Sequence, residues 1–287
     1  MKEFYKNLKW YFLILLFMGV MFIWYTIFQE DKENYLMVAF LDVGQGDAIF
    51  IEAPNGNQIL IDAGPNRKVL EELGKIMPFY DRSINMVIVT HPDNDHIGGL
   101  PSVLENYKID KIIKSDRKSD TPNFQASEKI IEETKIEKIL GKRGLKIILD
   151  NKKEIYLKIL LPDKKSNEWN DNDFSLVTQL IYGKNKFLMT GDISQSIENY
   201  LTYIDSDELD SDVLKIGHHG SKTSTSELFI EKVSPEYSII SVEKDNNYGH
   251  PHQETLDTLN KFKTKILSTA EEGVIIFKSN GEKLYLK

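Results

Sequence analysis

From residue 35 onward the chain alternates short apolar runs with polar turns. The first three strand-like runs, at 37–43, 48–53 and 58–63, follow one another closely, and the turn Pro54–Asn57 predicts that the last two are antiparallel. Apolar runs then alternate with helix-like segments, which predicts a layered α/β domain. The other predicted strands are 86–90, 109–114, 147–149, 155–161, 174–182, 187–189, 213–217 and 237–242, and the predicted helices are 67–77, 98–107, 124–140, 194–203, 226–233 and 253–262.

An uncharged apolar run, Trp10 to Phe28, precedes this region. Its length of about 19 residues is what a helix needs to cross a bilayer, and aromatic residues lie near both ends, as they do at membrane interfaces. Lysines at positions 2, 6 and 9 come before the run, and the acidic segment 30–33 follows it. This distribution of charge predicts that the N-terminus is inside and the main domain outside.

We therefore divide the chain into two parts. Residues 1–34 are expected to be an anchor, with a transmembrane helix at about 10–28 and a short linker. Residues 35–287 are expected to be one extracytoplasmic domain held at the cell membrane by a single pass. The alternatives are a cleaved signal peptide, which would make the protein secreted, and a buried core helix. The run shows no small-x-small cleavage pattern and no lipobox cysteine.

Composition narrows the chemistry. The net charge is −8, so the overall field does not attract nucleic acid, and a polyanionic substrate would need local lysines or bound cations. Lys215, Lys222 and Lys244 are candidates for that role, although most lysines are simply solvated. The chain contains no cysteine, which excludes disulfides, thiolate metal ligands and a cysteine nucleophile.

The six histidines fall in three pairs, each shortly after a predicted strand. Loops at strand ends, held by a rigid sheet, are where binding and catalytic residues usually lie. Imidazole and carboxylate groups both bind divalent first-row metals, so this clustering predicts a metal site. The pairs are His91 with His96, His218 with His219, and His250 with His252.

The first pair belongs to a six-residue loop, His91-Pro92-Asp93-Asn94-Asp95-His96, with four potential ligands. In an extended loop His91, Asp93 and Asp95 would lie near one another and His96 would face the other way, which could serve two ions. A simple polar turn is the alternative. Asp192 ends another apolar strand, where it could bridge two metals or cap the next helix.

Together these motifs resemble the metallo-β-lactamase superfamily, and within it the C-terminal hydrolase domain of ComEC-type competence (DNA-uptake) proteins. The resemblance implies an αββα four-layer sandwich, here preceded by one N-terminal transmembrane helix, with the metal site at one edge of the two sheets. The motifs occur in the family's order over nearly all of residues 35–287, and they are Phe40–Ala48, Leu60–Gly64, Thr90–Gly99, Thr190–Asp192, His218–Ser221 and Tyr248–His252.

The resemblance also implies roles for individual residues. The sequence does not decide which of His218 and His219 binds metal; we assign His218 to the metal set and His219, with Asp95 and His250, to the catalytic groups. Asp62 matches an aspartate that orients the site. By position, the metal ligands are His91, Asp93, Asp95, His96, Asp192 and His218.

Two departures from the superfamily's usual pattern bear on the metal. Asp93 stands where the superfamily usually has histidine, and the region 170–175 lacks its usual third histidine. ComEC-type domains share both departures. A carboxylate-rich site is harder than an all-imidazole site, so we expect one or two divalent ions, Mn²⁺ or Zn²⁺.

The expected reaction is hydrolysis of a phosphodiester, with single-stranded DNA as a candidate substrate. A metal-activated water would be positioned by Asp95 or Asp192, and His219 or His250 would stabilise charge or protonate the leaving oxygen. One alternative is a cell-surface esterase or phosphodiesterase acting on a small or cell-wall substrate, which the acidic net charge favours. The other is a non-catalytic anchored binding module.

Overall fold

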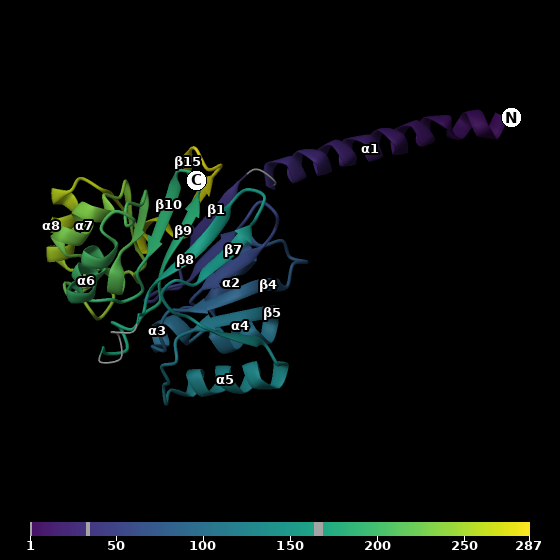
Figure 1. Cartoon of the computed structure of the whole chain (residues 1–287). Helices are drawn as coiled ribbons and strands as arrows, with labels where there is room; N and C mark the ends of the chain where they lie inside the picture. The colour runs from purple at the N-terminus through teal and green to yellow at the C-terminus, as the bar shows by residue number, and fades with distance from the viewer. Residues whose placement is uncertain (1, 33–34, 164–168) are drawn as a thin grey trace.

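A computed structural model describes residues 2–32, 35–163 and 169–287, and from residue 35 onward these form two mixed β-sheets (Figure 1). The first sheet has the order β15-β14-β1-β2-β3-β4-β5-β6. It is antiparallel from β15 to β3 and parallel from β3 to β6. Its strands are β1 (Leu36–Phe40), β2 (Ile49–Glu52), β3 (Gln58–Ile61), β4 (Ser83–Val89), β5 (Lys108–Lys114), β6 (Glu137–Leu140), β14 (Ile275–Ser279) and β15 (Leu284–Leu286).

The second sheet has the order β13-β12-β11-β10-β9-β8-β7. It is antiparallel from β7 to β10 and parallel from β10 to β13. Each sheet thus joins an antiparallel half to a parallel half, and the strands of a parallel half end at one common edge. The strands are β7 (Lys146–Asp150), β8 (Ile155–Leu161), β9 (Val177–Tyr182), β10 (Asn185–Met189), β11 (Val213–Lys215), β12 (Tyr237–Ile240) and β13 (Lys265–Ser268).

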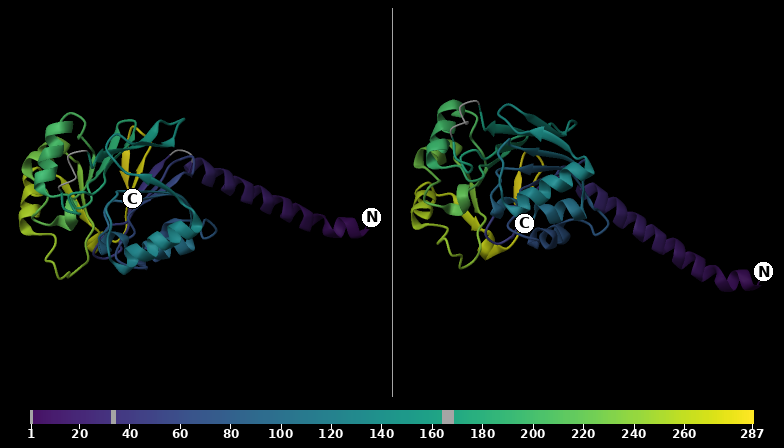
Figure 2. Two further views of the ribbon diagram at one scale, coloured as in Figure 1. Left: turned by 60° about the horizontal axis from the view of Figure 1, so that its bottom comes forward. Right: turned by 90° about the horizontal axis from the view of Figure 1, so that it is seen from below.

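Helices cover the outer face of each sheet. Helices α2, α4 and α5 pack on the first sheet and α6, α7 and α8 on the second, so the two groups lie on opposite sides of the sandwich (Figure 2). The helices of this part of the chain are α2 (Lys68–Ile76), α3 (Asn94–Ile97), α4 (Leu100–Asn106), α5 (Pro122–Thr134), α6 (Gln195–Asp205), α7 (Glu227–Val233), α8 (Gln253–Lys261) and α9 (Thr269–Glu272), with a 3₁₀ turn at Gly217–Gly220.

Side-chain alternation explains the layering, as β1 illustrates. Leu36, Val38 and Phe40 point into the core between the sheets, where Phe40 contacts Phe277 edge-on with ring centroids 6.2 Å apart. Ala39, one position out of step, faces the helical layer. A strand buried on both faces reads as a continuous apolar run, which is why β1 is apolar throughout. The resulting order of layers, helix–sheet–sheet–helix, confirms the predicted αββα sandwich.

The predicted helix at 124–140 is wrong beyond residue 134. Helix α5 ends at Thr134, and Lys135 adopts a left-handed conformation (φ 56°) that turns the chain into β6. Residues 137–140 then pair in parallel with β5. The spacing of Ile136 and Ile139 suits a helix, so pairing with β5 overrode the local pattern.

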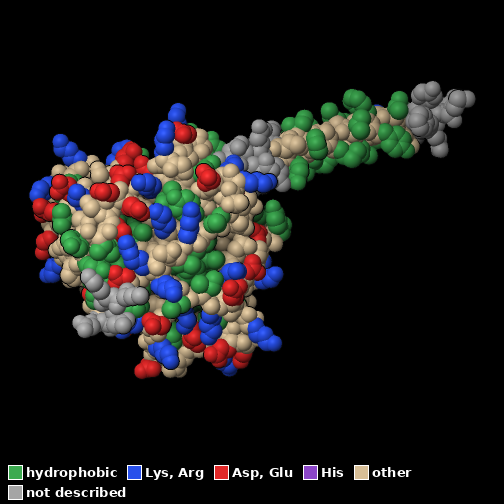
Figure 3. All heavy atoms as spheres, in the orientation of Figure 1, with side chains coloured by type: hydrophobic (Ala, Val, Ile, Leu, Met, Phe, Trp, Pro, Cys, Tyr) green, Lys and Arg blue, Asp and Glu red, His purple; other side chains and the backbone are tan. Residues whose placement is uncertain are grey.

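The first helix, α1 (Lys2–Lys32), lies outside the sandwich and extends away from it (Figure 1). Its segment Asn7–Thr26 has a mean hydropathy of 1.8, and none of it is buried against the rest of the protein. Hydrophobic side chains cover this helix, whereas the visible face of the sandwich mixes positive and negative groups (Figure 3). As predicted, the chain has an N-terminal helix long and apolar enough to span a membrane. Linker residues 33–34 lie outside the described residues.

Candidate metal centre

Four histidine side chains converge on one buried carboxylate. Asp192 follows β10, and its Oδ2 lies 3.4 Å from Nε2 of His96 and 3.6 Å from Nε2 of His219. The Nε2 atoms of His91 and His218 are each 3.9 Å from the same oxygen. In a tetrahedral site, ligand atoms about 2.1 Å from an ion lie roughly 3.4 Å from one another, so this spacing suits a common ion.

The two aspartates of the metal loop lie at the open side of this cluster. Oδ2 of Asp95 is 3.2 Å from Nε2 of His219, and Oδ2 of Asp93 is 3.8 Å from Nε2 of His91. Asp95, His96, Asp192 and His219 each offer a ligand atom, and these atoms lie within 4.8 Å of one another. Every residue that the sequence assigned to the metal set is therefore brought to one place.

The hydrogen bonds of the buried histidines leave the same atom of each ring available. Nδ1 of His96 donates to Asp62 (2.8 Å), and Nδ1 of His219 donates to the carbonyl of Ser241 (3.0 Å). For His91, Nδ1 lies 3.0 Å from Thr90 Oγ1 and 3.2 Å from Ser175 Oγ. These hydroxyls donate elsewhere, to Asp62 and to the carbonyl of Asn172, so each accepts from the ring. Each ring thus presents the lone pair of Nε2 to the cluster.

Those Nε2 atoms have no hydrogen-bond partner. The Nε2 atoms of His91, His96 and His219 and Oδ1 of Asp192 are buried without one. Buried polar atoms nearly always have hydrogen-bond partners. A bound cation would supply the missing partner for these four unpaired atoms. The residues present therefore fit a divalent metal, and the cluster can bind one.

The electrostatics of the cluster agree with this fit. Burial, together with the neighbouring His96, lowers the pKa of His91 to about 3. For His219 burial acts in the same direction, but Asp192 and Asp47 outweigh it and raise its pKa to about 9. Despite burial, the histidines hold the pKa of Asp192 well below its usual range. Without a cation, the buried carboxylates favour the protonated forms of His96 and His219, and a metal would compete with those protons.

Asp62 holds the metal loop in position, as its motif predicted. It lies just after β3 and is 1% exposed. Its carboxylate accepts hydrogen bonds from the backbone N–H of Thr90 (2.8 Å), from the Thr90 hydroxyl (2.6 Å) and from His96. One residue thus fixes both the end of β4 and the orientation of an imidazole.

A close backbone approach joins the loop after β1 to the metal loop. Asp47 N donates to the carbonyl of Asp95 (3.2 Å). A Cβ on the preceding residue, Gly46, would lie 2.1 Å from that carbonyl oxygen, and Gly46 has a φ of 144°. Only glycine permits this contact, which explains why position 46, within the motif Phe40–Ala48, is a glycine.

The adjacent histidines have different environments, although both adopt left-handed conformations, with φ of 49° at His218 and 54° at His219. The side chain of His219 is 1% exposed, whereas that of His218 is 31% exposed. Nδ1 of His218 lies 3.3 Å from the Thr223 hydroxyl. The geometry therefore favours His219 as the inner ligand and leaves His218 at the wall of the cavity.

A hollow of about 500 Å³ opens over the cluster. Its described lining includes Asp93, Asp95, His218, His219 and His250. His250 is half-buried, and burial together with the neighbouring histidines lowers its pKa to about 4. It faces Gln45, whose Nε2 is 3.5 Å from its Nδ1. The remaining histidine, His252, accepts the backbone N–H of Lys222 (3.2 Å) and holds a loop.

Lys215 does not have the phosphate-contacting role that its sequence position suggested. It is fully buried, and its Nζ pairs with Asp47 at 2.8 Å. A substrate in the hollow would not reach it. Lys222 and Lys244 are exposed, as expected of surface lysines.

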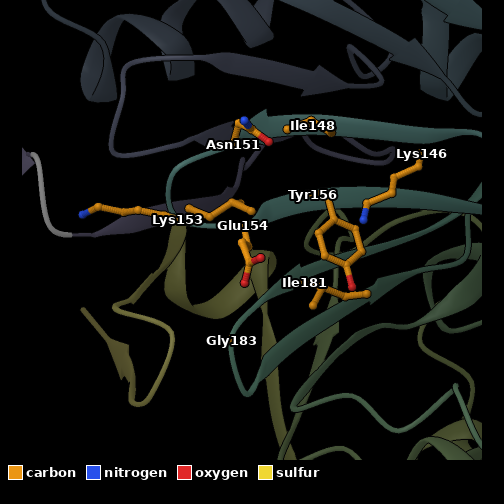
Figure 4. Close-up of a pocket in the computed structure, with 9 residues that line it drawn as sticks. Lys146, Ile148, Asn151, Lys153, Glu154, Tyr156, Ile181 and Gly183 are labelled. Atoms are coloured by element: carbon orange, nitrogen blue, oxygen red, sulfur yellow. The ribbon is translucent and has the colours of Figure 1, made fainter.

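A second hollow lies on the second sheet, over β7 and β8 (Figure 4). Tyr156 and Ile181 line it, and Nζ of Lys146 lies 3.6 Å from the centre of the Tyr156 ring. Glu154 is the one carboxylate among its lining residues, and the lining has no histidine. Among the described residues this hollow therefore offers no metal-ligand cluster.

Three contributors to the site were not assigned from the sequence. Ser175 lies in the region 170–175, where a histidine was noted as missing, and its hydroxyl contacts His91 instead. The Ser241 carbonyl orients His219, and Tyr248 lines the hollow. A serine and a backbone carbonyl carry no recognisable pattern, so only the fold could bring them to the site.

Comparison with known proteins agrees with this fold and site. Residues 41–243 match the metallo-β-lactamase superfamily. The chain is 30% identical over 261 residues to ComE operon protein 3 of Bacillus subtilis, covering 84% of this chain and 33% of that protein. It is 31% identical over 264 residues to Recombination protein 2 of Haemophilus influenzae, covering 90% and 31%. The chain thus spans about a third of the length of these curated relatives.

A solved structure has the same fold at low sequence identity. Igni18, a metallo hydrolase from Ignicoccus hospitalis, is 14% identical with a TM-score of 0.51, and the match covers 84% of this chain and 98% of that one. That likeness concerns the fold alone. The family match over residues 41–243 and the competence-protein relatives show more: the chain belongs to the metallo-β-lactamase superfamily of metal-dependent hydrolases.

Proposed function

We propose that this chain is a membrane-anchored phosphodiesterase that cleaves nucleic acid with a metal-activated water. The observation that carries the proposal is the set of orphaned, buried ligand atoms that face one another beneath an open hollow. The names of the relatives, a ComE operon protein and a recombination protein, favour a nucleic-acid substrate over a lactam. Asp93, where imidazole is usual in the superfamily, favours a harder ion such as Mn²⁺, with Zn²⁺ as the alternative.

Two metal positions would share Asp192. We assign His91 and Asp93, which lie 3.8 Å apart, to one position, and His96, His219 and Asp95 to the other, because Asp95 lies 3.2 Å from His219. Divalent ions held there would polarise a phosphoryl oxygen and lower the pKa of a coordinated water to about 7. The proposed ligands are His91, Asp93, Asp95, His96, Asp192 and His219.

This proposal exchanges the roles of the adjacent histidines. His219 becomes a ligand, since its ring is buried and oriented by a backbone carbonyl. His218 and His250, whose rings lie 5.7 Å apart, face the hollow, where they would contact substrate oxygens. Asp95 is partly exposed, so it would both hold an ion and orient the attacking water.

The test uses the full chain in non-ionic detergent, reconstituted with Mn²⁺ or Zn²⁺. Substrates are a single-stranded oligonucleotide and bis-p-nitrophenyl phosphate. Asp192→Asn and His91→Ala should each lower cleavage by at least about 100-fold, because each removes a metal ligand. Asp207→Asn is the matched control, since Asp207 is an exposed carboxylate on another part of the surface, and it should retain wild-type activity. Full activity in either ligand variant would contradict the site.

The second candidate function is hydrolysis of a small or cell-wall ester or phosphodiester, favoured by the net charge of −8. Cleavage of bis-p-nitrophenyl phosphate without cleavage of the oligonucleotide would support it. Tight metal binding with no cleavage of either substrate would instead support a non-catalytic binding module. The same assay therefore separates all three functions.

Helix α1 is proposed as the membrane anchor, with residues 35–287 as the extracytoplasmic hydrolase domain. The segment Asn7–Thr26 is unburied and apolar, and lysines before it favour an inside N-terminus. Protease added to intact cells should digest the domain while a cytoplasmic marker stays protected. A domain that is cleaved only after lysis would refute this orientation, and a chain that lacks α1 would indicate a processed signal peptide.

A further inference from the structure

Tyr248 is an exposed aromatic ring at the edge of the metal centre. It is 68% exposed, although it lines the same hollow as Asp95, His218 and His219. Of the described residues that line this hollow, it is the one with a phenyl-type ring; the others are aliphatic, polar, acidic or imidazole residues and one glycine. An exposed ring here adds nothing to the core, so packing does not account for it.

The backbone that carries the ring is held by a network around Asn246. Nδ2 of Asn246 donates to the carbonyls of Glu243 (3.0 Å) and His250 (2.6 Å). Its Oδ1 accepts the backbone N–H groups of Tyr248 and His250, each at 3.1 Å. One amide thus closes the loop 243–250, so the exposed ring is presented from a fixed backbone.

A neighbouring imidazole supports one face of the ring. The rings of Tyr248 and His250 are stacked, with centroids 5.8 Å apart and an interplanar angle of 25°. The His250 ring in turn meets that of His218 edge-on at 5.7 Å. Nε2 of His218 lies 3.9 Å from Asp192, so a continuous row of rings leads from the metal centre to Tyr248.

From this arrangement, and on the basis of the proposed phosphodiesterase function, we propose that Tyr248, backed by His250, is a stacking site for an unpaired nucleobase next to the cleaved phosphodiester. Every base has a π-face, and stacking on an aromatic side chain contributes about 1–3 kcal/mol per base. The ring carries no charge, so it does not repel a polyanion, whereas the acidic lining residues Asp93, Asp95 and Glu243 do. In a duplex both faces of a base are covered, so this site would favour single strands.

The test compares two substrates of equal phosphate content, oligodeoxythymidylate and an oligomer of the same length made only of abasic nucleotides. With the Mn²⁺-loaded full chain, Tyr248→Ala should lower kcat/KM on oligodeoxythymidylate about 5- to 150-fold, which is 1–3 kcal/mol at 1.4 kcal/mol per tenfold. Tyr248→Phe keeps the ring and should stay within about twofold. Tyr203→Ala, which removes an 85% exposed tyrosine of α6, is the matched control and should retain wild-type activity.

The abasic substrate separates stacking from damage to the loop. On it, wild type and Tyr248→Ala should differ by less than about twofold, because no base is present to stack. A loss of equal size on both substrates, or a Tyr248→Ala variant with wild-type activity on oligodeoxythymidylate, would overturn the stacking site while leaving the nuclease function intact. Cleavage of bis-p-nitrophenyl phosphate with no cleavage of either oligomer by wild type would overturn both.

A binding measurement without catalysis provides an independent readout. In EDTA, an oligonucleotide containing 2-aminopurine should lose fluorescence on binding to wild type and to Tyr248→Phe, since stacking on an aromatic ring quenches that base. Tyr248→Ala should give little quenching at protein concentrations that saturate binding. Equal quenching by all three proteins would refute the site.

Discussion

The buried pair of Lys215 and Asp47 gives the sharpest stability prediction. Lys215 ends β11 and projects between the sheets, where its Nζ lies 2.8 Å from Asp47, a residue of the loop between β1 and β2. Asp47 in turn has Oδ1 3.3 Å from Nδ1 of His219. The pair therefore ties the two sheets together directly beneath the metal centre. Removing the Lys215 ammonium group alone would leave the fully buried Asp47 carboxylate without its main partner.

Lys215→Met should destabilise the fold by about 3–5 kcal/mol, the usual cost of breaking a buried pair from one side. The double variant Lys215→Met/Asp47→Leu removes both charges and should lose clearly less than the single one, because an uncompensated charge no longer remains. Lys222→Met, at an exposed lysine, is the control and should change stability by less than about 0.5 kcal/mol. Urea unfolding of the full chain in detergent and EDTA, followed by circular dichroism, measures all three.

The same variant should change the response to acid. Burial opposes the charge on Asp47, but Lys215 and then His219 outweigh it and hold the pKa of Asp47 well below its usual range. A lowered folded-state pKa adds stability above the unfolded value of about 3.9, and this stability is lost as pH falls toward the folded value. Lys215→Met should therefore unfold at a higher pH than wild type. A cost under about 1 kcal/mol, or strictly additive losses in the double variant, would refute this account of the pair.

Three further predictions concern the centre and its support. His219→Ala should weaken metal binding more than His218→Ala, measured by competition with a chromophoric chelator, because His219 is the buried one of the two. Asp62→Asn should lower metal affinity about 10- to 100-fold in the same assay, since it disturbs the bond that orients His96. Burial raises the pKa of Glu198 to about 7, so the stability that this group contributes at low pH should fall as pH rises from about 4.5 to 7. Glu198→Gln should reduce this loss of stability with rising pH, as measured by urea unfolding at several pH values. An unchanged dependence of stability on pH would contradict the raised pKa of Glu198.

The place of the metal centre could be predicted because its residues follow strands directly. His91 comes two residues after β4 ends, and Asp192 three residues after β10. Apolar strands are easy to recognise in a sequence, and the strands of a parallel half end at the same edge of a sheet. Polar residues at such ends therefore gather, and the structure places Nε2 of His96 and of His219 3.4 and 3.6 Å from Oδ2 of Asp192.

The end of α5 could not be predicted in the same way. Residues 131–140 carry apolar side chains at a spacing that suits a helix, and no glycine or proline marks an end before Gly141. Lys135 takes the left-handed position that glycine usually occupies after a helix. What stabilises β6 is its pairing with β5, a contact with a segment more than twenty residues earlier in the chain. Local pattern alone does not contain that information.

The choice between His218 and His219 shows the same limit at the level of a single side chain. Alternation along a strand would place adjacent side chains on opposite faces, but here both residues have positive φ, so the rule does not apply. Which ring turns inward is decided by partners from other strands: the Ser241 carbonyl after β12 accepts from His219, and Asp47 approaches the same nitrogen from the first sheet. A sequence motif identifies that a histidine pair belongs to the centre. Which histidine of the pair becomes the ligand depends on the packing of the two sheets. A variant that loosens that packing, such as Lys215→Met, should therefore weaken the contribution of His219 to metal binding more than that of His218.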